Sequence, residues 1–147
     1  MTSRRVTLLT YGSRGDVEPF IALGIGLQQA GYRVRLAAPA KFETWAVGYG
    51  LEFAPIQGNP DDLAQAFADQ AGLSGLRMIG QMVRHVLPLA RSVFGAVEAA
   101  CSDADLIVHS FMMTDAGHTS AVFRGVPEVS AQFFPVFLST AAFPAVA

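Results

Sequence analysis

The sequence predicts an α/β fold in which a doubly wound parallel sheet carries helices on both faces. Short apolar or β-branched runs alternate with amphipathic segments of helical period along most of the chain. Strands that are separated by helices pair in parallel through right-handed crossovers, which places helices on both sides of the sheet. The 147 residues, of which 52% are hydrophobic, suffice for one domain with a buried core.

The chain begins with a strand, a turn and a helix. Residues 5–11 form a β-branched and aromatic run that ends at Gly12, which predicts a buried strand leading into a tight turn. Pro19 suits the first turn of the helix that follows, and Gly31 is a typical helix stop. The apolar face of this helix consists of Phe20, Ile21, Leu23, Ile25 and Leu27.

Four further elements are predicted before the middle of the chain. They are a strand, a short helix, a strand and a second short helix, over residues 32–38, 41–49, 51–56 and 61–70. Gly50 ends the first of these helices, and Asp61 or Asp62 can cap the second.

A long helix is predicted over residues 73–100, with one polar stripe along it that includes Pro88. Arg77, Arg84 and Arg91 lie seven residues apart on this stripe, and their charges argue against a membrane span. The stripe has two interpretations. It is either a solvated helix face or a weak peripheral contact with an anionic membrane. In the second case the protein would be located at the inner face of the membrane.

The last third of the chain predicts a strand, a helix and another strand, over residues 105–110, 115–123 and 126–132. An apolar and irregular stretch follows over residues 133–143.

Composition restricts the class of protein. The formal net charge of −2 gives no general attraction to nucleic acid, so we expect no nucleic-acid partner. The single cysteine, Cys101, cannot form an internal disulfide, and the amino terminus has no signal-peptide pattern. A cytoplasmic, reducing location is the expectation.

The turn over residues 12–19 is the strongest candidate site. It follows the first strand of a parallel sheet, where ligands commonly bind, and its two glycines allow close approach to the backbone. Asp16 places a carboxylate at the start of the helix. Asp16 is either a capping residue or a functional acid, and the pattern alone leaves both open.

Two common nucleotide sites do not fit this turn. Its Gly-x-x-Gly spacing lacks the Gly-x-Gly-x-x-Gly dinucleotide fingerprint, and residues 37–40 offer no acid for a ribose. No Gly-Lys-Ser or Gly-Lys-Thr follows, which excludes a P-loop. Histidines and carboxylates do not occur at metal-ligand spacing, so we expect no metal and no cofactor.

Residues 10–24, Thr-Tyr-Gly-Ser-Arg-Gly-Asp-Val-Glu-Pro-Phe-Ile-Ala-Leu-Gly, closely resemble the opening of the family 28 glycosyltransferases. This group includes sterol glucosyltransferases and the glycosyltransferases of macrolide and glycopeptide antibiotics. The resemblance continues more loosely through residues 31–34, 117–118, 125–127, 134–135 and 143–144. It implies one Rossmann-like half of a two-domain GT-B fold.

The resemblance also implies a function for the turn. An acceptor hydroxyl would attack the anomeric carbon of a nucleotide-sugar with inversion, and Asp16 matches the proposed general base. Gly12, Ser13 and Gly15 would shape the turn, and Ser13 or Arg14 would reach the acceptor or the diphosphate. Arg14 has an equally supported alternative, which is an ion pair with Asp16 or Glu18.

Further candidates follow the fourth and fifth strands. His109 and His118 could orient an acceptor hydroxyl or could simply be satisfied by neighbouring groups. Phe134 is a predicted substrate-binding residue, and the aromatic and methionine side chains around it suit an apolar acceptor such as a sterol, lipid or polyketide, or else core packing. These side chains are Phe111, Met112, Met113, Phe133, Phe134, Phe137 and Phe143.

Full enzymes of this family are more than twice as long. We therefore expect residues 1–147 to be the acceptor-side domain, with the domain that binds most of the nucleotide-sugar absent from the chain and the fragment alone inactive. The alternative function is a non-catalytic Rossmann-like domain that binds a small molecule or a protein.

Overall fold

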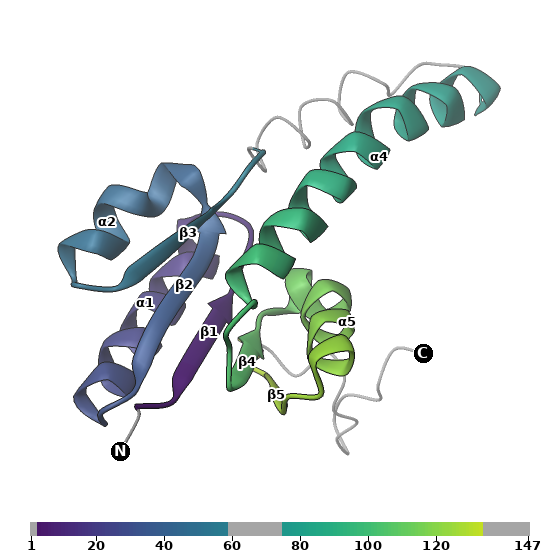
Figure 1. The fold of residues 1–147 in the computed structure, drawn as a ribbon. Coiled ribbons are helices and arrows are strands. Elements are labelled where there is room, and N and C mark those ends of the chain that lie inside the picture. Colours follow the sequence, from purple (N-terminus) through teal and green to yellow (C-terminus); the bar gives the residue numbers. More distant parts are fainter. Residues whose placement is uncertain (1–2, 59–74, 134–147) are drawn as a thin grey trace, which may run out of the picture.

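The computed structural model describes residues 3–58 and 75–133 of the chain (Figure 1). The helix predicted over residues 61–70 and the apolar stretch beyond Phe133 therefore lie outside the described residues, as does Phe134.

Five parallel strands form one sheet in the described residues, in the order β3-β2-β1-β4-β5 (Figure 1). Every neighbouring pair is parallel, which confirms the predicted doubly wound sheet. The strands span Arg5–Leu9 (β1), Arg33–Pro39 (β2), Glu52–Ile56 (β3), Leu106–His109 (β4) and Glu128–Ser130 (β5).

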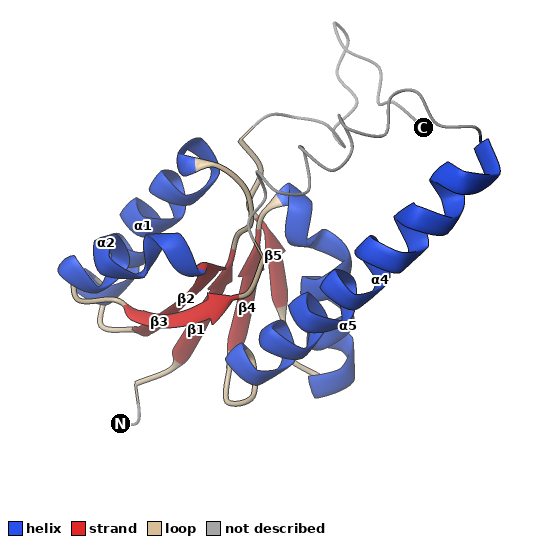
Figure 2. Ribbon diagram, turned by 90° about the horizontal axis from the view of Figure 1, so that it is seen from above, coloured by secondary structure: helices blue, strands red, loops and turns tan. Residues whose placement is uncertain are grey.

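Helices cover both faces of the sheet, as predicted (Figure 2). On one face α1 and α2 bury Phe20 and Ala46 against Leu8 and Leu36, and on the other face α4 and α5 bury Val97 and Ala116. The helices span Arg14–Gln29 (α1), Glu43–Gly48 (α2), Gly75–Ala100 (α4) and Thr114–Arg124 (α5), with short 3-10 turns at Ala40–Phe42 (η1) and Phe111–Met113 (η2).

The start of α1 differs from the sequence prediction. The helix begins at Arg14, so that Pro19 lies inside it rather than in its first turn. The cause is local, because Ser13 is the N-cap and forms a capping box with Asp16, which fixes the helix start before the proline. The predicted stop at Gly31 is confirmed by its positive φ of +90°.

The amino-terminal edge of the sheet carries an ion-pair network beneath the end of α4. Arg35 donates to Glu52 Oε1 and to Asp103 Oδ1, with its Nε and Nη1 each at 2.7 Å. Arg5 contacts the same two acids, with Nη1 2.5 Å from Glu52 Oε2 and Nε 3.0 Å from Asp103 Oδ2. Arg35 Nη1 also donates to the carbonyl of Ala100 at 2.7 Å, which satisfies the last turn of α4.

The network changes the titration of its acids. Burial alone would raise the pKa of Glu52, but the hydrogen bonds and positive charge of Arg35, together with Arg5, lower it overall. The pKa of Asp103 is lowered in the same way, since Arg35 and Arg5 outweigh its burial.

At the opposite, carboxyl-terminal edge, the chain changes direction across the sheet. It runs from β1 outward through β2 and β3, then returns to place β4 on the other side of β1. The ends of β1 and β4 are therefore neighbours, with Leu9 paired to His109. The loops after these strands diverge, and such a switch point is where open α/β sheets bind ligands.

Among the described residues, no helix is long and apolar enough to cross a membrane.

Candidate active site

Asp16 lies in the third position of α1, where its carboxylate is held by the turn itself. Oδ2 accepts a hydrogen bond from the backbone N–H of Ser13 at 2.7 Å and another from the Ser13 hydroxyl at 2.9 Å. Asp16 therefore caps the helix, as one of the two predicted interpretations requires. The side chain is half-buried, so capping does not remove it from contact with a ligand.

Gly12 is the glycine on which this geometry depends. Its φ is +142°, a region that side chains strongly disfavour, and an added Cβ would overlap the carboxylate of Asp16. Gly15 differs, because a Cβ there would meet Ser13 Oγ at an ordinary 3.7 Å. The shape of the turn itself thus requires a glycine at position 12 but not at position 15, and close approach of a ligand to either glycine stays a prediction.

A buried threonine joins β1 to the first turn of α1. The hydroxyl of Thr10 donates to the backbone carbonyl of Asp16 at 2.9 Å, and its own N–H donates to Ala37 at 3.0 Å. Thr10 is fully buried. The position of Asp16 is therefore fixed by the sheet as well as by the turn.

A pocket of about 370 Å³ opens beside Asp16 at the switch point. Gly12 comes from the turn after β1 and Asp16 from the first turn of α1, while the segments after β4 and β5 contribute the other lining residues. Its lining residues are Gly12, Asp16, Ser110, Phe111, Met112 and Phe133. The structure thus brings one carboxylate together with an otherwise largely apolar surface.

Arg14 turns away from Asp16. Its Nε lies 3.2 Å from Glu18 Oε2, and its guanidinium lies 4.9 Å from the ring centre of Trp45 in α2. Of the two ion pairs that the sequence left open, the one with Glu18 is present. Contact of Arg14 with the acceptor or the diphosphate stays a prediction. Arg14 remains largely exposed and is not among the described residues that line the Asp16 pocket.

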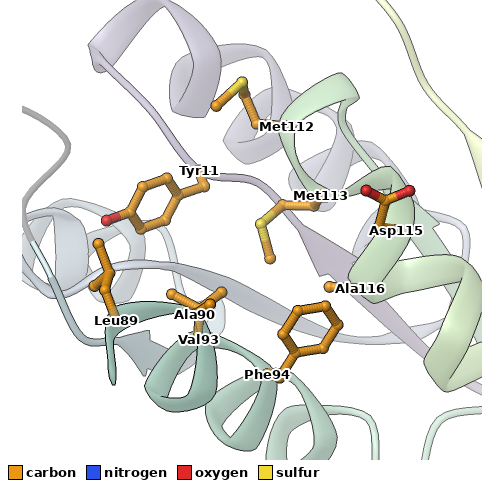
Figure 3. Close-up of a pocket in the computed structure, with 9 residues that line it drawn as sticks. All are labelled: Tyr11, Leu89, Ala90, Val93, Phe94, Met112, Met113, Asp115 and Ala116. Atoms are coloured by element: carbon orange, nitrogen blue, oxygen red, sulfur yellow. The ribbon is translucent and has the colours of Figure 1, made fainter. Parts of the chain in front are cut away.

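A second pocket, of about 230 Å³, lies on the other side of Met112, between α4 and the loop after β4 (Figure 3). In Figure 3 the side chains of Met113 and Phe94 point into the same space, which Tyr11 and Leu89 close at its far end. The lining is Tyr11, Leu89, Ala90, Val93, Phe94, Met112, Met113, Asp115 and Ala116. Asp115 is the one formally charged residue of this lining.

Gly58, two residues after β3, packs closely against Tyr11 and Leu89, which both line this second pocket. Gly58 has a φ of +99°, and a Cβ there would lie 2.5 Å from Leu89 Cδ1 and 3.1 Å from the Tyr11 hydroxyl. A glycine is therefore required for the loop after β3 to approach α4 so closely.

His118 and His109 meet a common acid rather than the Asp16 pocket. His118 Nδ1 lies 2.6 Å from Glu128 Oε1, and His109 Nε2 lies 3.4 Å from Glu128 Oε2. His109 is buried against Gly117, where an added Cβ would come within 2.8 Å of the imidazole. The proposed contact of His118 with an acceptor stays a prediction.

The sequence prediction gathered part of this site. Gly12, Asp16, Phe111, Met112 and Phe133 were all singled out in the sequence, and the structure places them around one pocket. Their role in binding stays a prediction. Thr10, Ser110, Trp45 and Glu128 were not singled out. The positions of Thr10 and Ser110 near the ends of predicted strands could have indicated them, whereas no local signal marks Trp45 or Glu128. Within the described ranges, no three His, Cys, Asp or Glu residues are grouped so that they could hold a metal ion.

The strand order and the glycine turn define a Rossmann-like domain, with a half-buried carboxylate at the switch point as its candidate site. Residues 6–129 match the glycosyltransferase family 28 N-terminal domain. The chain belongs to this family of glycosyltransferases.

Curated relatives agree with the family. The chain is 34% identical over 143 residues to a sterol 3-beta-glucosyltransferase of Debaryomyces hansenii, covering 97% of the chain and 9% of that protein. It is 35% identical over 108 residues to the sterol 3-beta-glucosyltransferase of Aspergillus fumigatus, covering 74% of the chain and 8% of the relative. The chain thus spans less than a tenth of the length of these relatives.

Solved structures confirm the fold. The calicheamicin glycosyltransferase CalG4 has a TM-score of 0.71 at 19% identity, with 97% of this chain and 35% of CalG4 covered. The Streptomyces sp. SF2575 glycosyltransferase SsfS6, complexed with thymidine diphosphate, has a TM-score of 0.61 at 20% identity, with 88% and 38% covered. The chain spans about a third of each neighbour.

Proposed function

We propose that the chain is the acceptor-binding half of an inverting glycosyltransferase, which moves a hexose from a nucleotide-sugar to a hydroxyl of an apolar acceptor. The observation that carries this proposal is the carboxylate of Asp16 at the edge of a pocket walled by Phe111, Met112 and Phe133. The nucleotide-sugar is a co-substrate that a second domain would hold, so the whole reaction needs more than these residues.

Asp16 would act as the general base. The acceptor oxygen forms a bond to the anomeric carbon, the bond from that carbon to the diphosphate oxygen breaks, and the acceptor proton passes to the carboxylate. Because Oδ2 already accepts two hydrogen bonds from Ser13, we assign the proton to Oδ1. General-base catalysis of this kind contributes about 10²–10⁴-fold to a rate.

The other predicted site residues take supporting roles in this proposal. Gly12 allows the carboxylate to sit against the turn, and Ser13 fixes its orientation. Arg14 would have to leave Glu18 in order to reach the donor diphosphate. The roles of Gly15, His118 and Phe134 in binding, and the cytoplasmic location, stay predictions.

One observation favours the alternative, a non-catalytic ligand-binding domain. The carboxylate of Asp16 completes a capping box, and such a cap gives the residue a structural reason to be present. The two functions predict different results when the carboxylate charge of Asp16 is removed: glycosyl transfer should slow if Asp16 is the base, and should persist if Asp16 only caps the helix.

The test is Asp16→Asn in a full-length protein that includes this domain. Asparagine keeps the shape and much of the cap but is not a base, so kcat should fall about tenfold to hundredfold with little change in melting temperature. Glu43→Gln removes an exposed acid from the first turn of α2, outside the lining of the Asp16 pocket, and serves as the matched control. Retained turnover in Asp16→Asn would assign Asp16 to capping and support the alternative.

A further inference from the structure

Ser110 is the first residue after β4, and hydrogen bonds tie its backbone to the neighbouring segments. Its N–H donates to the carbonyl of Leu9 in β1 at 2.9 Å, and its carbonyl accepts a hydrogen bond from the N–H of Met113 at 3.0 Å. Ser110 therefore has a fixed place relative to β1, and the turn that follows β1 leads to Asp16.

The hydroxyl of Ser110 takes no part in the hydrogen bonding of the described fold. Ser110 is the N-cap of η2, a position where a serine hydroxyl commonly accepts a backbone hydrogen bond, but its side chain makes no such bond here. The residue is 2% exposed, and Oγ has no hydrogen-bond partner among the described residues. A buried hydroxyl without a partner destabilises a fold, so its presence calls for a reason other than stability.

Ser110 also lines the Asp16 pocket. The other described residues of the lining are a glycine and three large apolar residues, namely Gly12, Phe111, Met112 and Phe133. A serine side chain turns about a single bond, so its hydroxyl can take a partner in the pocket without a shift of the backbone. The pocket thus combines a carboxylate and an unpaired hydroxyl within an apolar lining.

We propose that Ser110 orients the acceptor by donating a hydrogen bond to the same acceptor hydroxyl whose proton passes to Asp16, an assignment that rests on the proposed function. A hydroxyl oxygen has one proton and two lone pairs. The proton points to Oδ1 of Asp16, and the Ser110 hydroxyl holds one lone pair. The other lone pair is then directed at the anomeric carbon, where the new bond forms. Ser110 keeps its own proton throughout, so it positions the reacting oxygen and is not a second base.

A structural interpretation of Ser110 makes the opposite prediction. If position 110 only needs a small residue after β4, alanine would serve as well as serine in every respect. If the hydroxyl orients the acceptor, its loss should cost activity and leave the stability of the fold intact.

The first experiment compares two buried hydroxyls by urea denaturation of the chain. Ser110→Ala removes a hydroxyl without a partner, so the denaturation midpoint should stay the same or rise. Thr10→Val is the matched control, because it removes a buried hydroxyl that donates to the carbonyl of Asp16 at 2.9 Å, and its midpoint should fall. A fall in Ser110→Ala as large as in Thr10→Val would overturn the proposal, since the Ser110 hydroxyl would then have a structural partner.

The second experiment measures transfer by a full-length protein that includes this domain. The donor is UDP-glucose, and the acceptor is cholesterol, an apolar molecule with a single hydroxyl. Ser110→Ala should lower kcat about tenfold, the effect of one lost hydrogen bond to the reacting oxygen, and leave the KM for UDP-glucose unchanged. Ser110→Thr keeps a hydroxyl and should recover most of the lost rate.

Ser130→Ala is the matched control for activity. Ser130 ends the neighbouring strand β5, where it pairs with His109, and it is not among the described residues that line the Asp16 pocket. Its loss should leave kcat unchanged. Equal kcat in Ser110→Ala and in the unchanged protein would overturn the proposal.

Asp16→Asn separates this proposal from the proposed function. Lost turnover in Asp16→Asn with full turnover in Ser110→Ala would keep the general base and reject the role of Ser110. Slower transfer in Ser110→Ala with full turnover in Asp16→Asn would keep the contact between Ser110 and the acceptor and reject Asp16 as the base.

Discussion

At the amino-terminal edge of the sheet, two largely buried arginines share two acids, whereas at the carboxyl-terminal edge one half-buried acid borders a pocket. Arg5 and Arg35 each contact both Glu52 and Asp103, so the charges at the first edge satisfy one another. At the second edge Asp16 is oriented by Ser13, and the pocket leaves room for a ligand beside it.

The two edges of the sheet therefore differ in how their charged side chains are satisfied. Mutual ion pairs satisfy the charged groups at the amino-terminal edge, and its two acids have a lowered pKa. The carboxyl-terminal edge instead uses backbone geometry at Gly12 to hold a carboxylate at a pocket. The acids with a lowered pKa thus lie at the edge opposite the candidate site, where ion pairs account for the shift.

The largest effect should come from Gly12→Ala. Alanine at a φ of +142° is strained, and its Cβ displaces the carboxylate of Asp16 and breaks the capping box. The free energy of unfolding should fall by about 2–4 kcal/mol, as measured by urea denaturation. Gly15→Ala is the control and should leave stability unchanged or raise it by up to about 1 kcal/mol. Equal losses in both variants would contradict the special role of Gly12.

A smaller effect is expected at the other edge from Arg35→Met. The change removes the hydrogen bonds to Glu52, Asp103 and the Ala100 carbonyl, and we expect a loss of about 2–3 kcal/mol in unfolding free energy. In a full-length protein, turnover per folded molecule should stay unchanged. Arg33→Met, at an exposed position of the same strand, provides the comparison. A fall in kcat without a fall in the free energy of unfolding would show that the amino-terminal edge affects turnover directly, which contradicts the comparison.

The smallest effect should appear on acidification. The folded pKa values of Glu52 and Asp103 lie below their ordinary values of 4.5 and 3.8, so the network stabilises the fold at neutral pH and loses this contribution as pH falls through the lowered values. Both carboxylates are about half exposed, which limits the loss to about 1 kcal/mol or less for each. Urea denaturation at neutral pH and at about pH 3 measures this loss in the free energy of unfolding.

Glu52→Gln is the control for the pH experiment. The stability difference between this variant and the unchanged chain should shrink as pH falls, because protonation of Glu52 removes the same charge. A difference that stays constant with pH would show that Glu52 acts through packing instead.

The local pattern was sufficient for the alternation of strands and helices, for the helix stop at Gly31 and for the importance of the turn over residues 12–19. These features depend on short-range chemistry, namely the period of apolar residues and the backbone freedom of glycine. The exact start of α1 was predicted less well, because it depends on the reciprocal hydrogen bonds between Ser13 and Asp16 rather than on Pro19.

By itself the sequence determined the parallel α/β class, the helices on both faces and the candidate acid Asp16. Only the tertiary structure decided that Phe111, Met112 and Phe133 share a pocket with Asp16, that Arg14 pairs with Glu18, and that His118 meets Glu128. The physical reason is that apolar period fixes which side of an element is buried, whereas contacts between distant segments depend on strand order and register. Placing β4 beside β1 brought the loops after the two strands together, and no local pattern specifies that pairing.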